Sequence, residues 1–309
     1  MKRLLLTLSI VSIVLLAVLA VKNEYARLLP TEGFGMSEID DNENIDDLFM
    51  GASTFRKGLD IEVLEQLPGK TFVLNYNGNQ PVLMQKELEY LLDHGVSIKR
   101  LFIDFYPYTV AQQPRLSDTR LLLDTDLRFK LGLWQKLSSV APQPFLKRLT
   151  DGYEFFVSAN NMTILWYPLY RRQSLARNRH GGQTGMQHIH GSTKENLDRQ
   201  SSFGKRDGIQ ESQLEAIREI IRICASNQIE LRFIEIPKYH LLLKDSDYIE
   251  FADQVSKVID ETAGPGHIIR ADQIQLDTAE PEYFADWVHL SGTGAHLNTA
   301  QLITVIKGD

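Results

Sequence analysis

Short apolar segments rich in β-branched and aromatic residues alternate with longer segments of helical periodicity through most of this 309-residue chain. Each short segment is bounded by turn-forming residues, a pattern typical of buried strands. The predicted strands are Leu48 to Gly51, Thr71 to Asn75, Arg100 to Phe105, Glu230 to Ile236 and His267 to Ala271. Strands that alternate with helices pair in parallel through right-handed crossovers. The pattern therefore predicts an α/β fold, a three-layer α/β/α sandwich with a mostly parallel five-stranded sheet.

The longer segments have the apolar spacing of helices that pack one face against a core. They are Pro81 to His94, Asp118 to Ser139, Gln143 to Asn160, Gln210 to Asn227, Asp247 to Ala263 and Thr293 to Ile306. The chain has one cysteine, Cys224, which lies on the apolar stripe of the fourth helix and is predicted to be buried and inert. A single cysteine cannot form an intramolecular disulfide, so stability must come from a packed core.

Residues Leu4 to Val21 form an uncharged apolar run that follows Lys2 and Arg3. At about 1.5 Å per residue, a helix of this length spans roughly 27 Å, enough to cross a bilayer. Because cationic flanks tend to stay cytoplasmic, the main domain is predicted to be extracytoplasmic (periplasmic), on a single-pass protein of the inner or plasma membrane. Val18-Leu19-Ala20 also suits a signal-peptidase site, so residues 1–21 are predicted to be either an anchor or a cleaved signal.

The rest of the chain divides by composition. Residues 22–47 are polar and acidic and are predicted to form a stalk, and residues 48–309 form the α/β domain. The interval from about 110 to 210 lacks a convincing strand and is predicted to be a helical insertion. Within it, Arg171 to Asp207 is poor in large apolar residues and is predicted to be disordered. The formal net charge of -7 gives no electrostatic footprint for a nucleic acid.

A serine, a histidine and an aspartate have the positions that nucleophilic chemistry requires. The first predicted strand ends in L-F-M-G-A-S-T, which places Ser53 at the tip of an apolar strand. A serine hydroxyl needs a neighbouring base before it can attack a carbonyl. Near the other end, Asp286 and His289 are three residues apart in D-W-V-H. The carboxylate can orient one ring nitrogen while the other faces a serine, and the following turn places both residues at the rim of the sheet.

These segments resemble blocks of the SGNH/GDSL hydrolase superfamily: G-A-S at residues 51–53 and D-W-V-H-L-S-G-T-G-A at residues 286–295. They are more similar still to its membrane-anchored branch, which includes DltD-like proteins and the alginate O-acetylation proteins. The resemblance covers roughly residues 45 to 308 in block order and implies a flavodoxin-like sandwich. It also implies that Ser53 is the nucleophile, His289 the base and Asp286 the residue that orients the base.

The resemblance further implies an oxyanion hole. Its donors would be the backbone amide of Ser53 and, after the second predicted strand, that of Gly78, with Asn79 either as an added side-chain donor or as a turn residue. The superfamily's third block supplies an asparagine, whereas this chain has Asp104 in F-I-D-F-Y. An ionised Asp104 facing the oxyanion would repel it. Either Asp104 points elsewhere or the hole is built differently.

By this resemblance the chain is a membrane-anchored serine esterase or O-acyltransferase acting on a cell-envelope polysaccharide or related glycan. The implied partners are the membrane, a glycan or acyl-carrying substrate and envelope-assembly proteins, with no nucleic acid and no cofactor. The H-x-H pair at His188 and His190 is predicted to lie in a solvated loop, so no metal is predicted. The missing asparagine favours an alternative, a non-catalytic scaffold or binding component of an envelope polysaccharide assembly machine. In a third interpretation, the serine only closes a strand and the D-x-x-H loop only caps a helix.

Overall fold

The computed structural model describes residues 41–116, 125–140, 190–200 and 208–308, together with residues 10, 14, 36, 39, 118 and 121. The chain divides into two compact units, one of residues 1–32 and 119–176, the other of residues 33–118 and 177–309. In the first unit, the described part contains helix α6, Leu127–Val140. The second unit contains the sheet and the predicted site residues.

Five parallel strands form one sheet in the order β2-β1-β3-β4-β5. Their bounds are β1 Asn44–Gly51, β2 Thr71–Asn75, β3 Ser97–Asp104, β4 Glu230–Ile234 and β5 Ile268–Ile269. The predicted α/β class and the parallel five-stranded sheet are confirmed. Because the order reverses at β1, with β2 on one side and β3 on the other, the carboxyl ends of these strands border the position where such sheets usually bind ligands.

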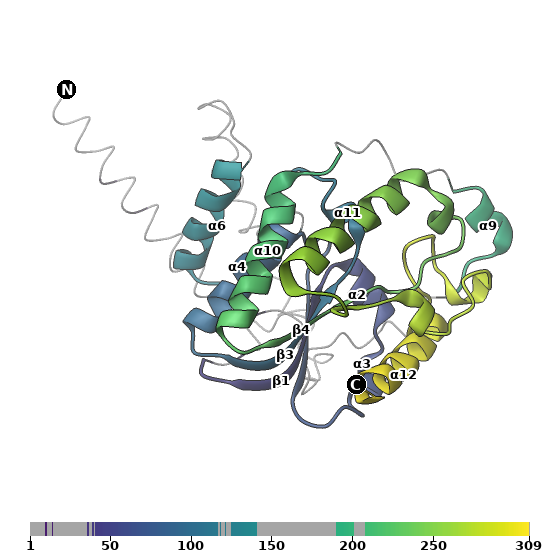
Figure 1. The fold of residues 1–309 in the computed structure, drawn as a ribbon, viewed down its shortest axis with the longest axis horizontal. Coiled ribbons are helices and arrows are strands. Elements are labelled where there is room, and N and C mark those ends of the chain that lie inside the picture. The colour runs from purple at the N-terminus through teal and green to yellow at the C-terminus, as the bar shows by residue number, and fades with distance from the viewer. Residues whose placement is uncertain are drawn as a thin grey trace. The chain divides into compact units, whose positions relative to one another are not determined.

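Helices cover both faces of this sheet, which gives three layers (Figure 1). On one face α10 packs between α4 and α11, and on the other α12 packs against α2 and α3. Their bounds are α4 Pro81–Asp93, α10 Glu211–Ser226, α11 Ser246–Ala263, α12 Gly292–Gly308, α2 Ser53–Gly58 and α3 Ile61–Leu64. Cys224 is buried on the inner face of α10, as predicted, and burial raises the pKa of its thiol to about 12.

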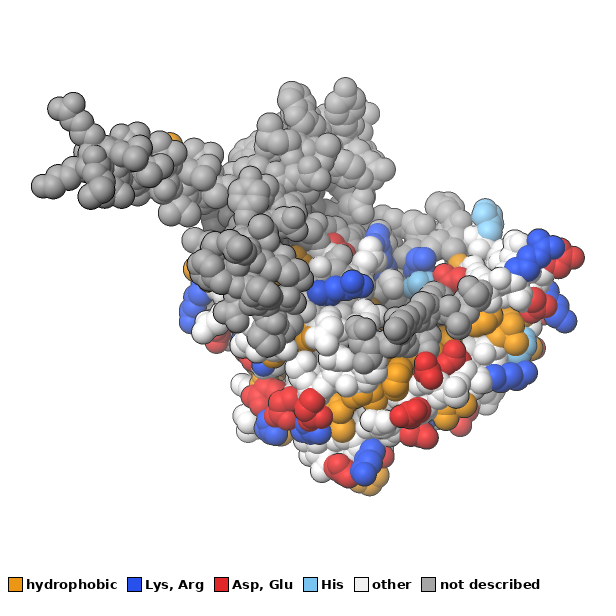
Figure 2. All heavy atoms as spheres, turned by 90° about the horizontal axis from the view of Figure 1, so that it is seen from above, with side chains coloured by type: hydrophobic (Ala, Val, Ile, Leu, Met, Phe, Trp, Pro, Cys, Tyr) orange, Lys and Arg blue, Asp and Glu red, His pale blue; other side chains and the backbone are white. Residues whose placement is uncertain are grey.

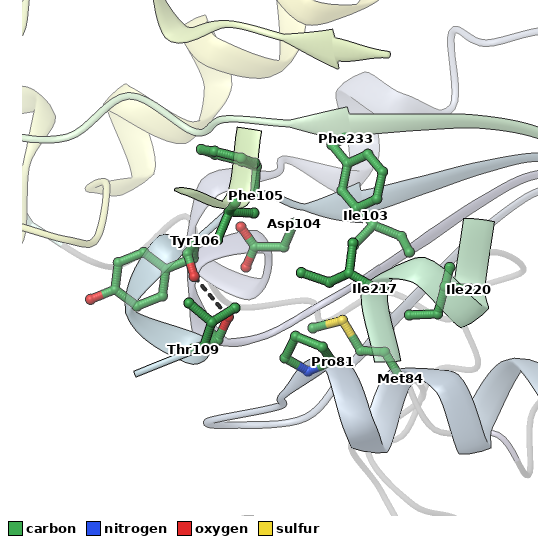
Figure 3. Close-up of a pocket in the computed structure, with 12 residues that line it drawn as sticks. Pro81, Met84, Ile103, Asp104, Phe105, Tyr106, Thr109, Ile217, Ile220 and Phe233 are labelled. Atoms are coloured by element: carbon green, nitrogen blue, oxygen red, sulfur yellow. Dashed lines mark hydrogen bonds between the residues drawn. The ribbon is translucent and has the colours of Figure 1, made fainter. Parts of the chain in front are cut away.

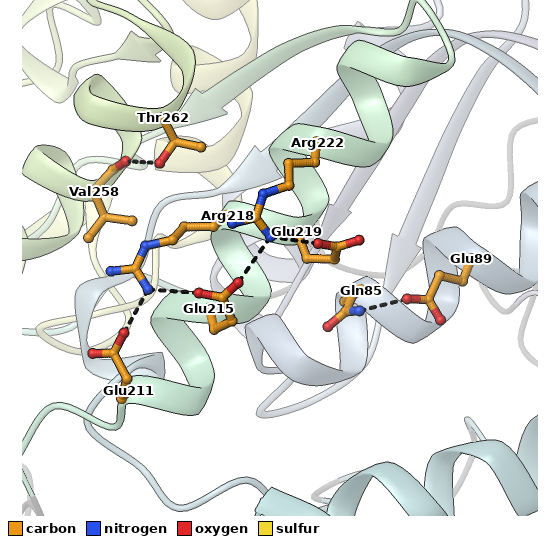
Figure 4. Close-up of polar contacts among 9 residues, drawn as sticks. All are labelled: Gln85, Glu89, Glu211, Glu215, Arg218, Glu219, Arg222, Val258 and Thr262. Atoms are coloured by element: carbon orange, nitrogen blue, oxygen red, sulfur yellow. Dashed lines mark hydrogen bonds and ion pairs between the residues drawn. The ribbon is translucent and has the colours of Figure 1, made fainter.

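The outer face of α10 carries a ladder of ion pairs between its exposed acidic and basic side chains (Figure 4). Arg218 binds Glu211 at 2.6 Å and Glu215 at 3.0 Å, and Arg222 binds Glu215 at 3.0 Å and Glu219 at 2.8 Å. Because water screens exposed charges, pairs of this kind contribute little to stability. On the face shown in Figure 2, basic and acidic side chains of the described residues are likewise interspersed.

The strand β1 begins at Asn44 rather than at the predicted Leu48, so the predicted stalk extends too far. Asp47 is fully buried within β1, and its carboxylate forms a bidentate ion pair with Arg100 of β3, at 2.5 and 2.8 Å. The cross-strand partner makes an acidic residue compatible with a buried strand. Hydrophobic pattern alone does not reveal such a partner.

Part of the tract predicted to be disordered is an ordered helix, α9, Lys194–Asp198. Leu197 is fully buried in the same core cluster as Tyr239 and Phe284. The Trp287 indole donates to the carbonyl oxygen of Leu197 at 2.7 Å. The prediction was wrong here because it weighed the composition of the tract alone, whereas one apolar side chain and a tertiary hydrogen bond hold a short helix in place.

The predicted membrane segment Leu4 to Val21 lies outside the described residues except for residues 10 and 14, and the predicted helix Gln143 to Asn160 lies wholly outside them. Within the part of the chain that the structure describes, no helix has both the length and the apolar character needed to cross a bilayer.

Candidate active site

Ser53 lies where the sheet meets helix α2, two residues after the end of β1 and at the first position of α2. The turn begins at Gly51, which lies very close to the neighbouring strand. A Cβ atom on Gly51 would come within 2.7 Å of the Cβ of Asp104 and 2.8 Å of the Phe55 ring. Only glycine fits this contact without displacing its neighbours, so it fixes how the turn presents Ser53.

We expect Gly51→Ala to destabilise the protein by about 1 to 3 kcal/mol, the usual cost of overpacking a core. The midpoint of thermal unfolding, followed by tryptophan fluorescence of the full chain, measures the effect. Gly308→Ala is the matched control, because a Cβ atom there meets nothing within 4 Å. Equal midpoints for Gly51→Ala and the control would show that the turn adapts to a side chain.

The loop between β5 and α12 is closed by an isolated bridge that pairs Phe284 with Leu290. Inside it, Asp286 Oδ1 accepts hydrogen bonds from the backbone amides of Val288 at 2.8 Å and His289 at 2.9 Å. The aspartate therefore shapes the turn that carries the histidine, in the manner of an Asx turn.

The structure brings the loop to Ser53. The Oγ atom of Ser53 lies 2.9 Å from Nε2 of His289, and Nδ1 of His289 lies 2.7 Å from Oδ2 of Asp286. An alcohol, an imidazole and a carboxylate are thus in hydrogen-bonded sequence, the order in which a base can activate a nucleophile while an acid orients the base. The side chains of His289 and Asp286 are 16% and 27% exposed, so the imidazole is open to solvent on one side.

Asp286 is held in its charged form. Burial favours the neutral acid, but the hydrogen bond and charge of His289, together with the backbone amides of Val288 and His289, outweigh burial and lower the pKa of Asp286. An ionised carboxylate accepts the Nδ1 hydrogen of the ring, which leaves Nε2 free to accept the proton of Ser53.

Two backbone amides beside this arrangement are available as donors. The amides of Ser53 and Gly78 donate to no acceptor among the described residues. Gly78 is exposed, with φ of 63°, in the turn after β2. Gly51 and Asn75 are paired in register, so the two turns start side by side at the same edge of the sheet. This placement suits the predicted pair of backbone oxyanion donors.

The side chain of Asn79 has a different role from the predicted oxyanion donor. It is fully buried, and its Nδ2 donates to the carbonyl oxygen of Gly51 at 3.4 Å and to Oε2 of Glu87 at 3.1 Å. Both hydrogens of the amide are therefore committed within the core. The interpretation as a turn residue fits the structure, because Asn79 ties the turn after β2 to the end of β1.

Asp104 points at the turn that carries Ser53. Its Oδ2 accepts hydrogen bonds from the backbone amide of Ala52 at 3.3 Å and from the hydroxyl of Thr54. The carboxylate is therefore hydrogen-bonded to the residues on both sides of Ser53. The pKa of Asp104 is raised, because burial outweighs the charge of Lys238, the two hydrogen bonds and the charge of His289, which act in the opposite direction.

Sequence reasoning missed Thr54 and Lys238. Lys238 is fully buried just beyond the carboxyl end of β4, within E-I-P-K-Y-H. The available signal was a lone lysine two residues after the predicted strand Glu230 to Ile236. The backbone amide of its neighbour Tyr239 donates to the carbonyl oxygen of Trp287. This bond ties the segment to the loop of Asp286 and His289.

Among the described residues, no group of three or more His, Cys, Asp or Glu side chains is arranged to hold a metal ion. His188 lies outside the described residues. No protein-family model matches the chain, and no curated protein is significantly similar to it. The function must therefore be inferred from the geometry of the site.

Proposed function

We propose that the protein is a serine esterase or O-acyltransferase of the SGNH/GDSL type. The observation that carries the proposal is the hydrogen-bonded sequence from Ser53 through His289 to Asp286, whose members come from opposite ends of the domain. A serine that only closed the strand β1 would have no need of a histidine at its hydroxyl, or of an acid that orients the histidine.

In the proposed reaction, Ser53 Oγ attacks the acyl carbon of an ester while its proton passes to His289 Nε2. Asp286 stabilises the resulting imidazolium. As the tetrahedral intermediate collapses, the bond from carbon to the alcohol oxygen breaks, and Nε2 returns the proton to that oxygen. Water or a sugar hydroxyl then attacks the acyl carbon and loses its proton to His289 Nε2. The bond from the acyl carbon to Ser53 Oγ breaks, and Nε2 returns the proton to Oγ.

The negative charge on the carbonyl oxygen requires donors that are fixed before the reaction. The amides of Ser53 and Gly78 would serve, each worth about 3 kcal/mol in comparable sites. Asp104 does not occupy this position, because its Oδ2 accepts hydrogen bonds from Ala52 and Thr54. The hole would then be built from backbone alone, without a side-chain amide after β3.

Assignment to the SGNH type has two further supports. The strand order 2-1-3-4-5 is that of flavodoxin-like sheets. The candidate nucleophile follows β1, and the acid and base precede the last helix, α12. This arrangement agrees with the block order of the resemblance.

The proposed location is extracytoplasmic, with the apolar segment Leu4 to Val21 as a membrane anchor, and the proposed substrate is an acylated cell-envelope glycan. Confinement at the membrane raises the effective concentration of a polymer substrate there without adding contacts. Envelope-assembly proteins are the proposed partners.

A fluorophosphonate probe tests the chemistry, because it labels only serines that a base has activated. We expect the full chain in mild detergent to be labelled, and the label to be lost in Ser53→Ala and His289→Ala. Ser97→Ala, at an exposed serine that begins β3, is the matched control and should be labelled like the wild type. A wild-type protein that is neither labelled nor able to cleave an aryl acetate would refute the enzyme and favour the scaffold.

A further inference from the structure

Ser53 and His289 are held in place by different parts of the fold. The sheet positions Ser53, because Asp104, at the end of β3, is hydrogen-bonded to Ala52 and Thr54. Figure 3 shows this carboxyl group at a small cavity with about 20 Å³ of free space, among apolar side chains of the core. His289 lies instead on the loop between β5 and α12, so its position must be set by other contacts.

Trp287 separates the acid from the base in D-W-V-H and is held through both its backbone and its side chain. Its carbonyl oxygen accepts from the backbone amide of Tyr239 at 3.1 Å. Its own backbone amide donates to Oε1 of Gln200 at 3.2 Å, and its indole Nε1 donates to the carbonyl oxygen of Leu197 at 2.7 Å. Both donors of Trp287 therefore bind one short stretch of chain, residues 190–200, which contains α9 and is called the α9 segment below.

The α9 segment also contacts the beginning of the loop. The backbone amide of Ser192 donates to the carbonyl oxygen of Phe284 at 2.7 Å. A Cβ atom on Gly191 would come within 2.2 Å of the carbonyl oxygen of Glu282, so the two backbones are in close contact there. The segment thus touches the loop at its start and again at the residue between the acid and the base.

The helix α9 cannot owe its order to its own hydrogen bonds. It has 5 residues, whereas an isolated helix is marginal in water below about 12 to 15 residues. Its one buried residue is Leu197, in the core cluster that contains Tyr239 and Phe284, and the other four side chains of α9 are exposed. The contacts that order the helix are therefore those that reach the core and the loop, so the segment and the loop stabilise each other.

We propose that the α9 segment holds the loop of Asp286 and His289 in its reactive position, with Gln200 as the positioning residue on the segment. This inference rests on the proposed function. Gln200 acts through Trp287, because its hydrogen bond fixes the backbone between the acid and the base. His289 Nε2 lies 2.9 Å from Ser53 Oγ, so a small shift of this backbone breaks the contact through which the base takes the proton.

Gln200→Leu removes the acceptor for the Trp287 amide and keeps a side chain of similar size. We expect the second-order rate constant of fluorophosphonate labelling at pH 7 to fall roughly tenfold, since a 1 Å misplacement can cost about a hundredfold. The final fraction of labelled protein should equal that of the wild type, because the fold persists and only the loop is displaced. A merely structural role would lower that fraction and leave the rate constant unchanged.

Two further variants control this experiment. Gln200→Glu keeps an oxygen that accepts from the Trp287 amide, so its rate constant should return to within about threefold of the wild type. Gln301→Leu replaces another partly buried glutamine, on α12, whose side-chain amide donates to the carbonyl oxygen of Gln275. It should be labelled at the wild-type rate.

Leu197→Ala removes the side chain that anchors α9 and should release the whole segment. We expect labelling to slow at least as much as in Gln200→Leu. The double variant Leu197→Ala/Gln200→Leu should be labelled at about the rate of Leu197→Ala alone, because a released segment offers neither bond to the loop. Ile306→Ala is the matched control: it opens the same core cluster near the end of α12, and should lower the midpoint of thermal unfolding without slowing labelling.

Trp287 reports the same contact without any catalysis. Replacing the other two tryptophans, Trp134 and Trp166, by phenylalanine leaves Trp287 as the only indole that emits. Its indole is hydrogen-bonded to the α9 segment and packs against buried side chains. We expect Leu197→Ala in this background to move the emission to longer wavelength and to increase quenching by acrylamide.

Wild-type labelling of Gln200→Leu, a lower labelled fraction at an unchanged rate constant, multiplied losses in the double variant, or unchanged emission in Leu197→Ala would each overturn this proposal while leaving the enzyme in place. If Leu197→Ala does not fold, the two Gln200 variants decide. A wild-type protein that is not labelled at all would instead refute the proposed function, and the positioning role with it.

Discussion

Asp286→Asn should slow fluorophosphonate labelling of Ser53 by roughly 10³- to 10⁴-fold, the loss typical of removing the charge of a triad acid. The substitution keeps Oδ1, which accepts the backbone amides of Val288 and His289, so the loop keeps its shape. The new amide group, however, donates to Nδ1 of His289. The imidazole is then held as the tautomer whose Nε2 carries a hydrogen and cannot accept the proton of Ser53.

Asp277→Asn is the matched control, because Asp277 is exposed and its side chain likewise accepts a backbone amide two residues on, from Ala279. It should be labelled at the wild-type rate. Rates for both variants are measured with the full chain as a function of probe concentration. A loss of less than tenfold in Asp286→Asn would mean that the carboxylate is not part of the chemistry, whatever its contact with His289.

The fold was accessible from the sequence because both periodicities are strong. Buried strands such as Thr71–Asn75 are short apolar runs, and helices such as α10 carry a continuous apolar stripe. The approach of Ser53 to His289 was predicted because Ser53 ends a strand, the D-x-x-H loop lies at the rim of the sheet, and the segments that carry both resemble blocks of a serine hydrolase superfamily. The roles of these residues in catalysis stay a prediction.

Features that depend on a partner distant in sequence could not be predicted from the sequence. A pattern that lists apolar residues cannot show that Asp47 pairs with Arg100, or that Asn79 donates to Glu87. Both contacts join elements that approach only in the folded domain. For the same reason the sequence left open whether Asp104 faces the oxyanion, and it did not reveal that Lys238, after β4, is buried.

A second buried acid is linked through Asn79 to the turn that carries Ser53, and its ionisation can be tested. Glu87, on α4, is fully buried, and it accepts a hydrogen bond from Asn79, which in turn donates to the carbonyl oxygen of Gly51. Burial raises the pKa of Glu87 to about 8, helped by the charge of Asp118 and opposed by the hydrogen bond from Asn79. Glu87 is therefore mostly neutral at pH 7.

The pKa of Glu87 is higher in the folded protein than in the unfolded chain, so its contribution to stability is fully present below about pH 4.5. It is lost as the pH rises through about 8. Glu87→Gln replaces the neutral acid with a neutral amide whose oxygen still accepts from Asn79. We expect the variant to match the wild type near pH 5 and to be more stable by roughly 3 to 5 kcal/mol near pH 9.

For a domain of this size the difference corresponds to a midpoint of thermal unfolding higher by roughly 10 °C at pH 9. Tryptophan fluorescence of the heated full chain, recorded from pH 5 to 9, measures it. Glu89→Gln is the control on the same helix, because Glu89 is only partly buried and is paired with Lys86. Its midpoints should run parallel to those of the wild type. Parallel curves for Glu87→Gln as well would mean that Glu87 is ionised in the folded protein, and that Asn79 braces the turn through a charged acceptor.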